Sequence, residues 1–313
     1  MNDAFDAVVV GAGPAGLVGA TYLARFKRSV LTIDSGSSRA LRIPRSHNVP
    51  GFPGGVAGSE LVASMRQQAE HHGMQFAAGH VDTLAPDGDG WTLRWPGGQA
   101  RARTVLLATG ANDIEPAMPK LSEALRNGAL RYCPVCDGYE VIGQSVGVVS
   151  DGPSGVKEAI YLRHFTDRVT LFLTDPEKVL DSSAQAELAA AGVQWAPGQL
   201  ESMALVDDRV LITHDGRQQV CDSVYSAFGM QVHSILAVKA GAKTNEDGYL
   251  ETDGHQQTTL PRVYAAGDVA SGLNQISVAS DAQGVTSGPR LVPISRPSSW
   301  SGLPTGTAAS PAT

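Results

Sequence analysis

The stretch Val10-Gly11-Ala12-Gly13-Pro14-Ala15-Gly16 decides the fold of the N-terminal part of the chain. An apolar run over residues 5–10 leads into it, and a helical pattern continues to about residue 26. A second apolar run over residues 29–33 ends at the acid Asp34. A Gly-x-Gly-x-x-Gly turn between a buried strand and a helix, with an acid after the next strand, is the dinucleotide-binding fingerprint. The pattern therefore predicts an α/β, Rossmann-like fold that binds a nucleotide.

The residues of this turn have separate predicted roles. Gly11 makes the tight turn, Gly13 lets the backbone approach a pyrophosphate, and Gly16 permits close packing of the helix on the strand. The helix that begins near Pro14 presents its amide groups and the positive end of its dipole to phosphates. The Asp34 carboxylate is placed to accept hydrogen bonds from ribose hydroxyl groups.

A second unit of the same kind follows in the middle of the chain. The apolar run 145–149 leads into Ser150-Asp151-Gly152-Pro153-Ser154-Gly155, then a helical stretch over 156–165 and a strand over 168–173. This is an imperfect repeat of the first unit, because Ser150 stands where the first glycine is expected. The sequence therefore predicts two Rossmann-like modules.

Two cysteines lie between the two units, in Arg131-Tyr132-Cys133-Pro134-Val135-Cys136-Asp137-Gly138-Tyr139-Glu140. A Cys-x-x-Cys pair can close as a disulfide and reopen as a dithiol, which makes a two-electron switch beside a nucleotide cofactor. Half of a zinc site and a purely structural disulfide are the alternatives. Zinc usually takes four ligands, and only Cys221 remains, with no partner at a matching spacing. We therefore expect no metal site, and Cys221 is expected in the core.

Composition limits the classes of function. The chain has 313 residues and a formal net charge of -7, which argues against a nucleic-acid surface. No apolar run is long enough to span a membrane, and the N-terminus enters a strand without a signal peptide. Three cysteines in a chain of this length do not make a disulfide scaffold, so the expected location is cytoplasmic and the Cys pair is expected to be catalytic.

Further motifs lie outside the two units. Residues 35–58 form a long irregular stretch that contains His47-Asn48-Val49-Pro50-Gly51-Phe52-Pro53-Gly54-Gly55, and a loop of this length is usually functional. Ala108-Thr109-Gly110 and Ala266-Gly267-Asp268 each end a predicted strand, and Asn274-Gln275-Ile276-Ser277 begins a predicted helix. The tail 288–313 is rich in Pro, Ser, Gly and Thr and is expected to be irregular, with Trp300 its one feature suited to docking.

Together these pieces resemble the low-molecular-weight thioredoxin reductase family of flavoproteins over about residues 5–287. Five motifs recur in the family's order: 11–16, 47–55, 108–110, 133–137 and 266–268. The resemblance implies two Rossmann-like, three-layer domains of the thioredoxin reductase type. A discontinuous FAD-binding domain would comprise 1–112 and 246–313, and an inserted pyridine-nucleotide-type domain would comprise 113–245. The resemblance also implies a homodimer.

The resemblance assigns site residues as well. It implies that Asp268 binds the flavin ribitol, that Cys136 faces the flavin, and that Cys133 exchanges with the substrate. Asp137 would be the acid/base that protonates or activates a thiol, and its alternative is a turn residue in Asp-Gly. The FAD-binding set is Gly11, Gly13, Pro14, Ala15, Gly16, Asp34, His47, Asn48, Thr109, Gly110, Gly267, Asp268, Gln275 and Ile276.

The chain departs from the family in its second module. Typical thioredoxin reductases carry a His-Arg-Arg stretch, with a further Arg, that binds the 2′-phosphate of NADPH. This chain has Leu173-Thr174-Asp175 there, and a carboxylate repels a phosphate. Together with Ser150, this makes tight NADPH binding doubtful. Asp175 suits the free 2′-hydroxyl of NADH, although it lies slightly beyond the usual position of the acid.

One branch of the family has lost the nicotinamide donor. It comprises the disulfide-closing enzymes of the gliotoxin, holomycin and romidepsin types, which the stretch Gly138-Tyr139-Glu140 resembles, although the first two types carry His where this chain has Asp137. The leading hypothesis is therefore an FAD-dependent dithiol oxidase that closes a disulfide in a small molecule and passes electrons to oxygen. The alternatives are a disulfide reductase acting on a thioredoxin-like protein, driven by NADPH, NADH or ferredoxin, and a non-enzymatic flavin-binding redox sensor.

Overall fold

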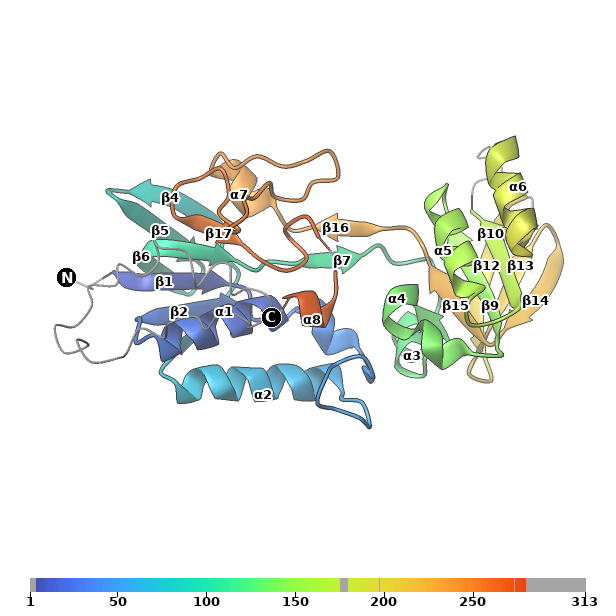
Figure 1. Cartoon of the computed structure of the whole chain (residues 1–313), viewed down its shortest axis with the longest axis horizontal. Helices are drawn as coiled ribbons and strands as arrows, with labels where there is room; N and C mark the ends of the chain where they lie inside the picture. The colour runs from blue at the N-terminus through green and yellow to red at the C-terminus, as the bar shows by residue number, and fades with distance from the viewer. Residues whose placement is uncertain (1–3, 175–179, 197, 273, 280–313) are drawn as a thin grey trace, which may run out of the picture.

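The computed structural model describes residues 4–174, 180–196, 198–272 and 274–279. The chain forms two modules that are joined by a pair of strands (Figure 1). The larger module contains the N-terminal residues and the described C-terminal residues, and the smaller one is built from the middle of the chain. The predictions for Asp175, for the tail 288–313 and for Trp300 lie outside the described residues.

The larger module is a three-layer α/β structure. Its central strands are parallel in the order β3, β2, β1, β6, β17, and two antiparallel strands, β5 and β4, continue from the N-terminal half of β6. The bounds are β1 (Phe5–Val10), β2 (Val30–Asp34), β3 (Gln75–Ala78), β4 (Thr83–Asp87), β5 (Gly90–Trp95), β6 (Gly98–Leu107) and β17 (Val263–Ala265).

Alternation along β1 divides the core of this module into two halves. Ala7 and Val9 pack beneath α1 (Pro14–Arg25) and α2 (Gly58–His71), whereas Val8 and Val10 face the opposite side. That opposite side is filled by apolar residues of β4 and β5 and by Leu236 of α7 (Ile235–Lys239). Because side chains of a strand alternate between faces, the buried run of β1 supports both halves and holds the glycine turn after Val10 in place.

The smaller module has the same three-layer plan. Its parallel sheet has the order β11-β10-β9-β15-β8, with α5 and α6 on one face and the antiparallel sheet β12-β13-β14 on the other. The strands are β8 (Leu130–Arg131), β9 (Ser145–Ser150), β10 (Arg168–Leu173), β11 (Gln194–Ala196), β12 (Leu200–Val206), β13 (Arg209–His214), β14 (Arg217–Cys221) and β15 (Ser223–Ser226). The helices are α3 (Leu121–Arg126), α4 (Pro134–Asp137), α5 (Ser154–Leu162) and α6 (Ser182–Ala191), and Cys221 is buried as predicted.

Two short strands cross between the modules. β7 (Ala111–Asp113) and β16 (Met230–Val232) pair antiparallel and lie side by side in Figure 1. The predicted limits of the inserted domain, 113 and 245, remain a prediction. The packing places residues 236–242 with the larger module, because Leu236, Ala237 and Ala242 are buried in its core.

The structure of two segments is settled by strand pairing. Residues 83–87, which lie outside both predicted units, form β4, whose Leu84 pairs with Leu93 of β5. The stretch 217–226 forms two strands in different sheets, β14 and β15. Asp222 separates them, because its backbone N–H donates to Ser145 and so turns the chain from one sheet to the other. Within the described ranges, no helix is long and apolar enough to cross a membrane.

Candidate active site

A cavity of about 970 Å³ lies where the two modules meet. It runs from the N-terminus of α1, past the loop that contains η1 (Arg39–Arg42), to the cysteine pair. All of the predicted site residues except Gly16 line it: Gly11, Gly13, Pro14, Ala15, Asp34, His47, Asn48, Thr109, Gly110, Cys133, Cys136, Asp137, Gly267, Asp268, Gln275 and Ile276. The fold thus brings together residues of all five motifs.

The first turn accepts only glycine at two positions. Gly11 has a φ of +104°, and a Cβ there would lie 2.2 Å from the carbonyl oxygen of Ala108. A Cβ on Gly16 would lie 2.0 Å from the carbonyl oxygen of Gly11. Gly16 therefore packs the helix against the turn, which explains why it is absent from the cavity wall.

The N-terminus of α1 fits a phosphate group. The helix has no side-chain cap at Gly13 and no acid in its first turn, so its first amide groups are left for another acceptor. A Cβ on Gly13 would meet only the Ser38 hydroxyl, at 3.1 Å, so the backbone is open to the cavity at this point. The Asp34 carboxylate accepts hydrogen bonds from the backbone of Ala12 and Gly36, both at 2.8 Å, and holds the loop around this end of the cavity.

An ion-pair bridge connects the cavity to the strands between the modules. Arg39 donates from Nε and Nη2 to the two carboxylate oxygens of Asp113 at 2.7 and 2.6 Å. Its Nη1 atom lies 3.6 Å from Oδ2 of Asp268. Burial raises the pKa of the Asp268 carboxyl above its ordinary value, and the charge of Arg39 opposes this effect. No sequence signal pointed to Arg39 or Asp113, which lie far apart in the chain.

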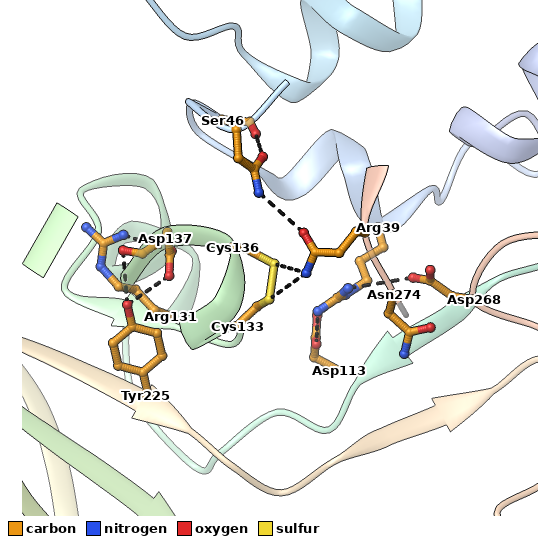
Figure 2. The surroundings of a disulfide bond; sticks show 12 residues. Arg39, Ser46, Asp113, Arg131, Cys133, Cys136, Asp137, Tyr225, Asp268 and Asn274 are labelled. Carbon is orange, nitrogen blue, oxygen red and sulfur yellow. Dashed lines mark hydrogen bonds and ion pairs between the residues drawn. A yellow bond between two sulfur atoms is a disulfide. The ribbon is translucent and has the colours of Figure 1, made fainter. Parts of the chain in front are cut away.

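Cys133 and Cys136 form a disulfide at the start of α4 (Figure 2). The side-chain amide of Gln275 lies 3.2 Å from Sγ of Cys136 and 3.6 Å from Sγ of Cys133. Asn48 in turn donates to Oε1 of Gln275 at 3.3 Å and accepts from the Ser46 hydroxyl at 2.7 Å. A chain of polar contacts thus leads from the loop of the larger module to the sulfur atoms of the smaller one.

Asp137 lies apart from these contacts. Its Oδ2 atom accepts from Nη1 of Arg131 at 2.8 Å, and its Oδ1 atom accepts from the hydroxyl of Tyr225 at 2.8 Å. Figure 2 shows the carboxyl group directed toward Arg131 and Tyr225, whereas the sulfur atoms face the other way. Burial raises the pKa of Asp137 above its ordinary value, and Arg131 and Tyr225 act in the opposite direction.

A second contact between the modules was missed by sequence reasoning. Nδ1 of His47 lies 2.8 Å from Oε1 of Glu140, and both residues line the cavity. Glu140 lies in η2 (Gly138–Val141), directly after α4. Its position four residues beyond Cys136 was the available signal, because residues this close in sequence remain close in space.

The loop of the second module is filled by the side chain of Ser150. This buried hydroxyl accepts from the backbone N–H groups of Gly152 and Gly155, both at 3.2 Å, and donates to the carbonyl oxygen of Gly152 at 3.0 Å. In a dinucleotide-binding loop such N–H groups are the donors that receive the pyrophosphate. Ser150 thus takes up donors that a bound nucleotide would need.

The comparisons with known proteins agree with this geometry. A family model described as pyridine nucleotide-disulphide oxidoreductase matches residues 5–284. A thioredoxin reductase of Treponema pallidum (strain Nichols) is 31% identical over 294 residues, which cover 90% of this chain and 94% of that protein.

Two solved structures are similar over almost the whole chain. The crystal structure of HlmI has a TM-score of 0.83 at 29% identity and covers 91% of this chain and 92% of its own. A thioredoxin reductase from Streptococcus pyogenes MGAS5005 has a TM-score of 0.84 at 28% identity and covers 93% and 98%. The predicted two-module, three-layer α/β fold of the thioredoxin reductase type is confirmed. The chain belongs to the pyridine nucleotide-disulphide oxidoreductase family, as an FAD-dependent disulfide oxidoreductase similar to the thioredoxin reductases.

Proposed function

We propose that this protein is a dithiol oxidase, which closes a disulfide in a small-molecule substrate and passes the electrons to oxygen. One observation carries the proposal: the Ser150 hydroxyl fills the second nucleotide loop, while the disulfide and the first nucleotide loop are intact. A reductase needs a donor that delivers electrons to the flavin. An oxidase needs no nicotinamide, because its electrons arrive from the substrate thiols.

The geometry at Ser150 argues against a pyrophosphate in that loop. The hydroxyl is also 3.3 Å from the carbonyl oxygen of Ala227, which directly follows the neighbouring strand β15. The side chain is therefore bonded to that part of the sheet as well. The Ser150 Cβ lies where it would be 2.4 Å from a Cβ on Gly155, so the side chain fills the space between strand and helix. A nucleotide would have to replace these bonds without the cationic 2′-phosphate clamp found in NADPH-dependent relatives.

The larger module supplies the place for FAD. The open N-terminus of α1 suits the pyrophosphate, and Asp34 suits the ribose. Gln275 lines the cavity at the disulfide, and Asp268 lines it beside Arg39. FAD, when bound, supplies a two-electron acceptor for the thiols. Gln275 is the residue that would lie between this acceptor and the sulfur atoms.

The cysteine pair carries the exchange. A substrate thiolate attacks Sγ of Cys133, the Cys133–Cys136 bond breaks, and Cys136 leaves as a thiolate. The second substrate thiolate then attacks the substrate sulfur of the mixed disulfide and displaces Cys133. The substrate loses two electrons and two protons, and the cysteine pair gains the two electrons. The Gln275 amide lies closer to Cys136 and stabilises its thiolate by hydrogen bonding.

The structural similarity to HlmI is consistent with this branch. Other relatives are named thioredoxin reductase, which favours the second candidate function, reduction of a thioredoxin-like protein. The electron donor in that case would be NADPH, NADH or ferredoxin. Either function is compatible with a cytoplasmic homodimer, which we retain as part of the proposal. Light scattering of the purified protein tests the dimer, and a monomer at micromolar concentration contradicts it.

The decisive experiment is reduction of the flavin without oxygen. The FAD-loaded protein is mixed separately with NADPH, NADH and dithiothreitol, and the flavin absorbance is followed. Rapid bleaching by the dithiol alone, reversed by air with release of peroxide, supports the oxidase. Rapid bleaching by a nicotinamide nucleotide contradicts it and supports the reductase.

A further inference from the structure

The disulfide exchange needs a base, and Asp137 is badly placed to be one. Only the thiolate form of a substrate attacks a disulfide, so a thiol must first lose its proton. Both carboxylate oxygens of Asp137 already accept hydrogen bonds, from Arg131 and from Tyr225. The carboxyl group also faces away from the sulfur atoms in Figure 2. Asp137 therefore anchors the cysteine helix to the sheet of its own module.

Another titratable pair lies on the cavity side of the disulfide. His47 and Glu140 line the same cavity as Cys133 and Cys136, and their side chains are 2.8 Å apart. Glu140 lies in η2, four residues after Cys136 in the sequence, and reaches the loop of the larger module through His47. The residue after His47, Asn48, contacts Gln275, and Gln275 contacts Cys136. His47 is thus the sequence neighbour of the residue that begins the polar contacts leading to the disulfide.

The contacts of the pair suit proton transfer. A histidine that donates from Nδ1 to a carboxylate keeps its Nε2 atom as an acceptor. The Oε2 atom of Glu140 is buried and has no hydrogen-bond partner among the described residues, so the carboxylate has spare capacity to stabilise a charged imidazole. The neighbouring cation, Arg45, is occupied with the carbonyl oxygens of Gly54 and Gly55.

We propose that His47 accepts the proton of the attacking substrate thiol, and that Glu140 is the positioning residue that orients His47. The thiol S–H bond breaks, its proton moves to Nε2 of His47, and the sulfur lone pair forms the bond to Cys133 while Cys136 departs with the electrons of the old bond. The imidazole supplied by His47 takes the place of a base at residue 137. This inference rests on the thiol-exchange half of the proposed function and not on the direction of electron flow.

The test is a single-turnover measurement of disulfide reduction. Oxidised protein is mixed anaerobically with a dithiol, quenched with a maleimide, and the labelled cysteines are quantified by mass spectrometry. Two dithiols are compared: dithiothreitol, and bis(2-mercaptoethyl) sulfone, whose thiols are more acidic. His47→Gln is expected to slow dithiothreitol on the order of 10²-fold and the more acidic dithiol much less, because the latter needs less help to ionise.

Two matched variants complete the experiment. Glu140→Gln keeps the shape of the side chain and is expected to slow dithiothreitol about tenfold, with the same preference between dithiols. Asp137→Asn is expected to slow both dithiols equally or not at all. FAD content and circular dichroism confirm that each variant is folded, and Glu140→Gln decides the question alone if His47→Gln does not fold.

Several results overturn the inference. An equal loss with both dithiols in His47→Gln means a structural role, and a loss specific to dithiothreitol in Asp137→Asn makes Asp137 the base. A rate within twofold of the parent in His47→Gln also excludes His47. A failure of the proposed function is detected by the flavin-reduction experiment and not by this one. A nicotinamide-driven reductase would still exchange its disulfide with a dithiol in this assay without oxygen.

Discussion

The side-chain amide of Gln275 lies 3.2 Å from Sγ of Cys136, although 139 positions separate the two residues. The contact joins the C-terminal part of the larger module to the redox centre of the smaller one. It also makes the two cysteines unequal, because Sγ of Cys133 is 3.6 Å from the same nitrogen. A donor next to one sulfur atom favours that sulfur as the leaving thiolate.

Removal of this amide should lower the fraction of Cys136 that is present as the thiolate near neutral pH. In reduced protein, Gln275→Ala is expected to slow alkylation of Cys136 by iodoacetamide about five- to tenfold, since a hydrogen bond to a charged group is lost. Peptide mapping after timed quenching measures it. Asn48→Ala, which removes only the contact that orients Gln275, should give a smaller change; an unchanged rate in Gln275→Ala contradicts the role.

The two cysteines should differ in their reaction with a small disulfide. In Cys136→Ser, the remaining Cys133 is expected to form a stable mixed disulfide with 5,5′-dithiobis(2-nitrobenzoate), because no second thiol can resolve it. In Cys133→Ser, the remaining Cys136 should react about tenfold more slowly, because the proposed mechanism gives the exchange with the substrate to Cys133. Release of the coloured thiolate is followed at neutral pH, and equal rates contradict the assignment.

Alanine at the two turn glycines should separate folding from cofactor binding. Gly11→Ala places a Cβ against the Ala108 carbonyl at a positive φ and is expected to lower the free energy of unfolding by about 3 kcal/mol or more. Gly13→Ala needs only a small shift of the Ser38 side chain and should instead reduce bound FAD. Urea unfolding and the ratio of flavin to protein absorbance measure the two effects. Normal FAD content in Gly13→Ala contradicts the pyrophosphate site.

Glycine at residue 150 should partly restore nucleotide binding. Ser150→Gly frees the amide groups of Gly152 and Gly155. The parent protein is expected to bind NADH very weakly, and the variant is expected to have a dissociation constant for NADH about tenfold lower. Isothermal titration calorimetry of both proteins measures this change. Tight NADPH binding by the parent protein would show that the Ser150 contacts open readily.

Glu158 should make stability depend on pH. Burial raises its pKa to about 7 from 4.5, and its Oε2 atom has no partner among the described residues. Between these two pH values the folded state binds a proton at Glu158 that the unfolded state has lost. The free energy of unfolding therefore falls as the pH rises from 4.5 to about 7. Glu158→Gln is expected to be more stable by about 1–3 kcal/mol at about pH 8 and equal near pH 4.5, as measured by urea unfolding.

The sequence was most informative where a pattern is local. The strand–turn–helix units around Gly11 and Ser150 follow from apolar periodicity and glycine spacing, and the structure reproduces them. The strand β4 is not evident from the sequence, because Pro86 and Asp87 are typical of a loop. Its structure is decided by its pairing with β5 and by the burial of Leu84.

Contacts between distant residues could not be predicted in the same way. The Arg39–Asp113 ion pair and the His47–Glu140 contact span 74 and 93 positions, and each depends on how the two modules meet. The role proposed for Asp137 rested on its place in the sequence beside Cys136. Its orientation toward Tyr225 is set by the sheet below, which sequence spacing does not reveal.

A loop whose amide groups are bonded within the chain reaches its folded form without a ligand. The contacts of Ser150 with Gly152 and Gly155 therefore make the smaller module self-sufficient: its stability should not vary with the cellular supply of nicotinamide nucleotides. Heating the protein with and without NADPH should give the same melting temperature, whereas addition of FAD should raise it. The cell could then control the amount of working protein through flavin alone.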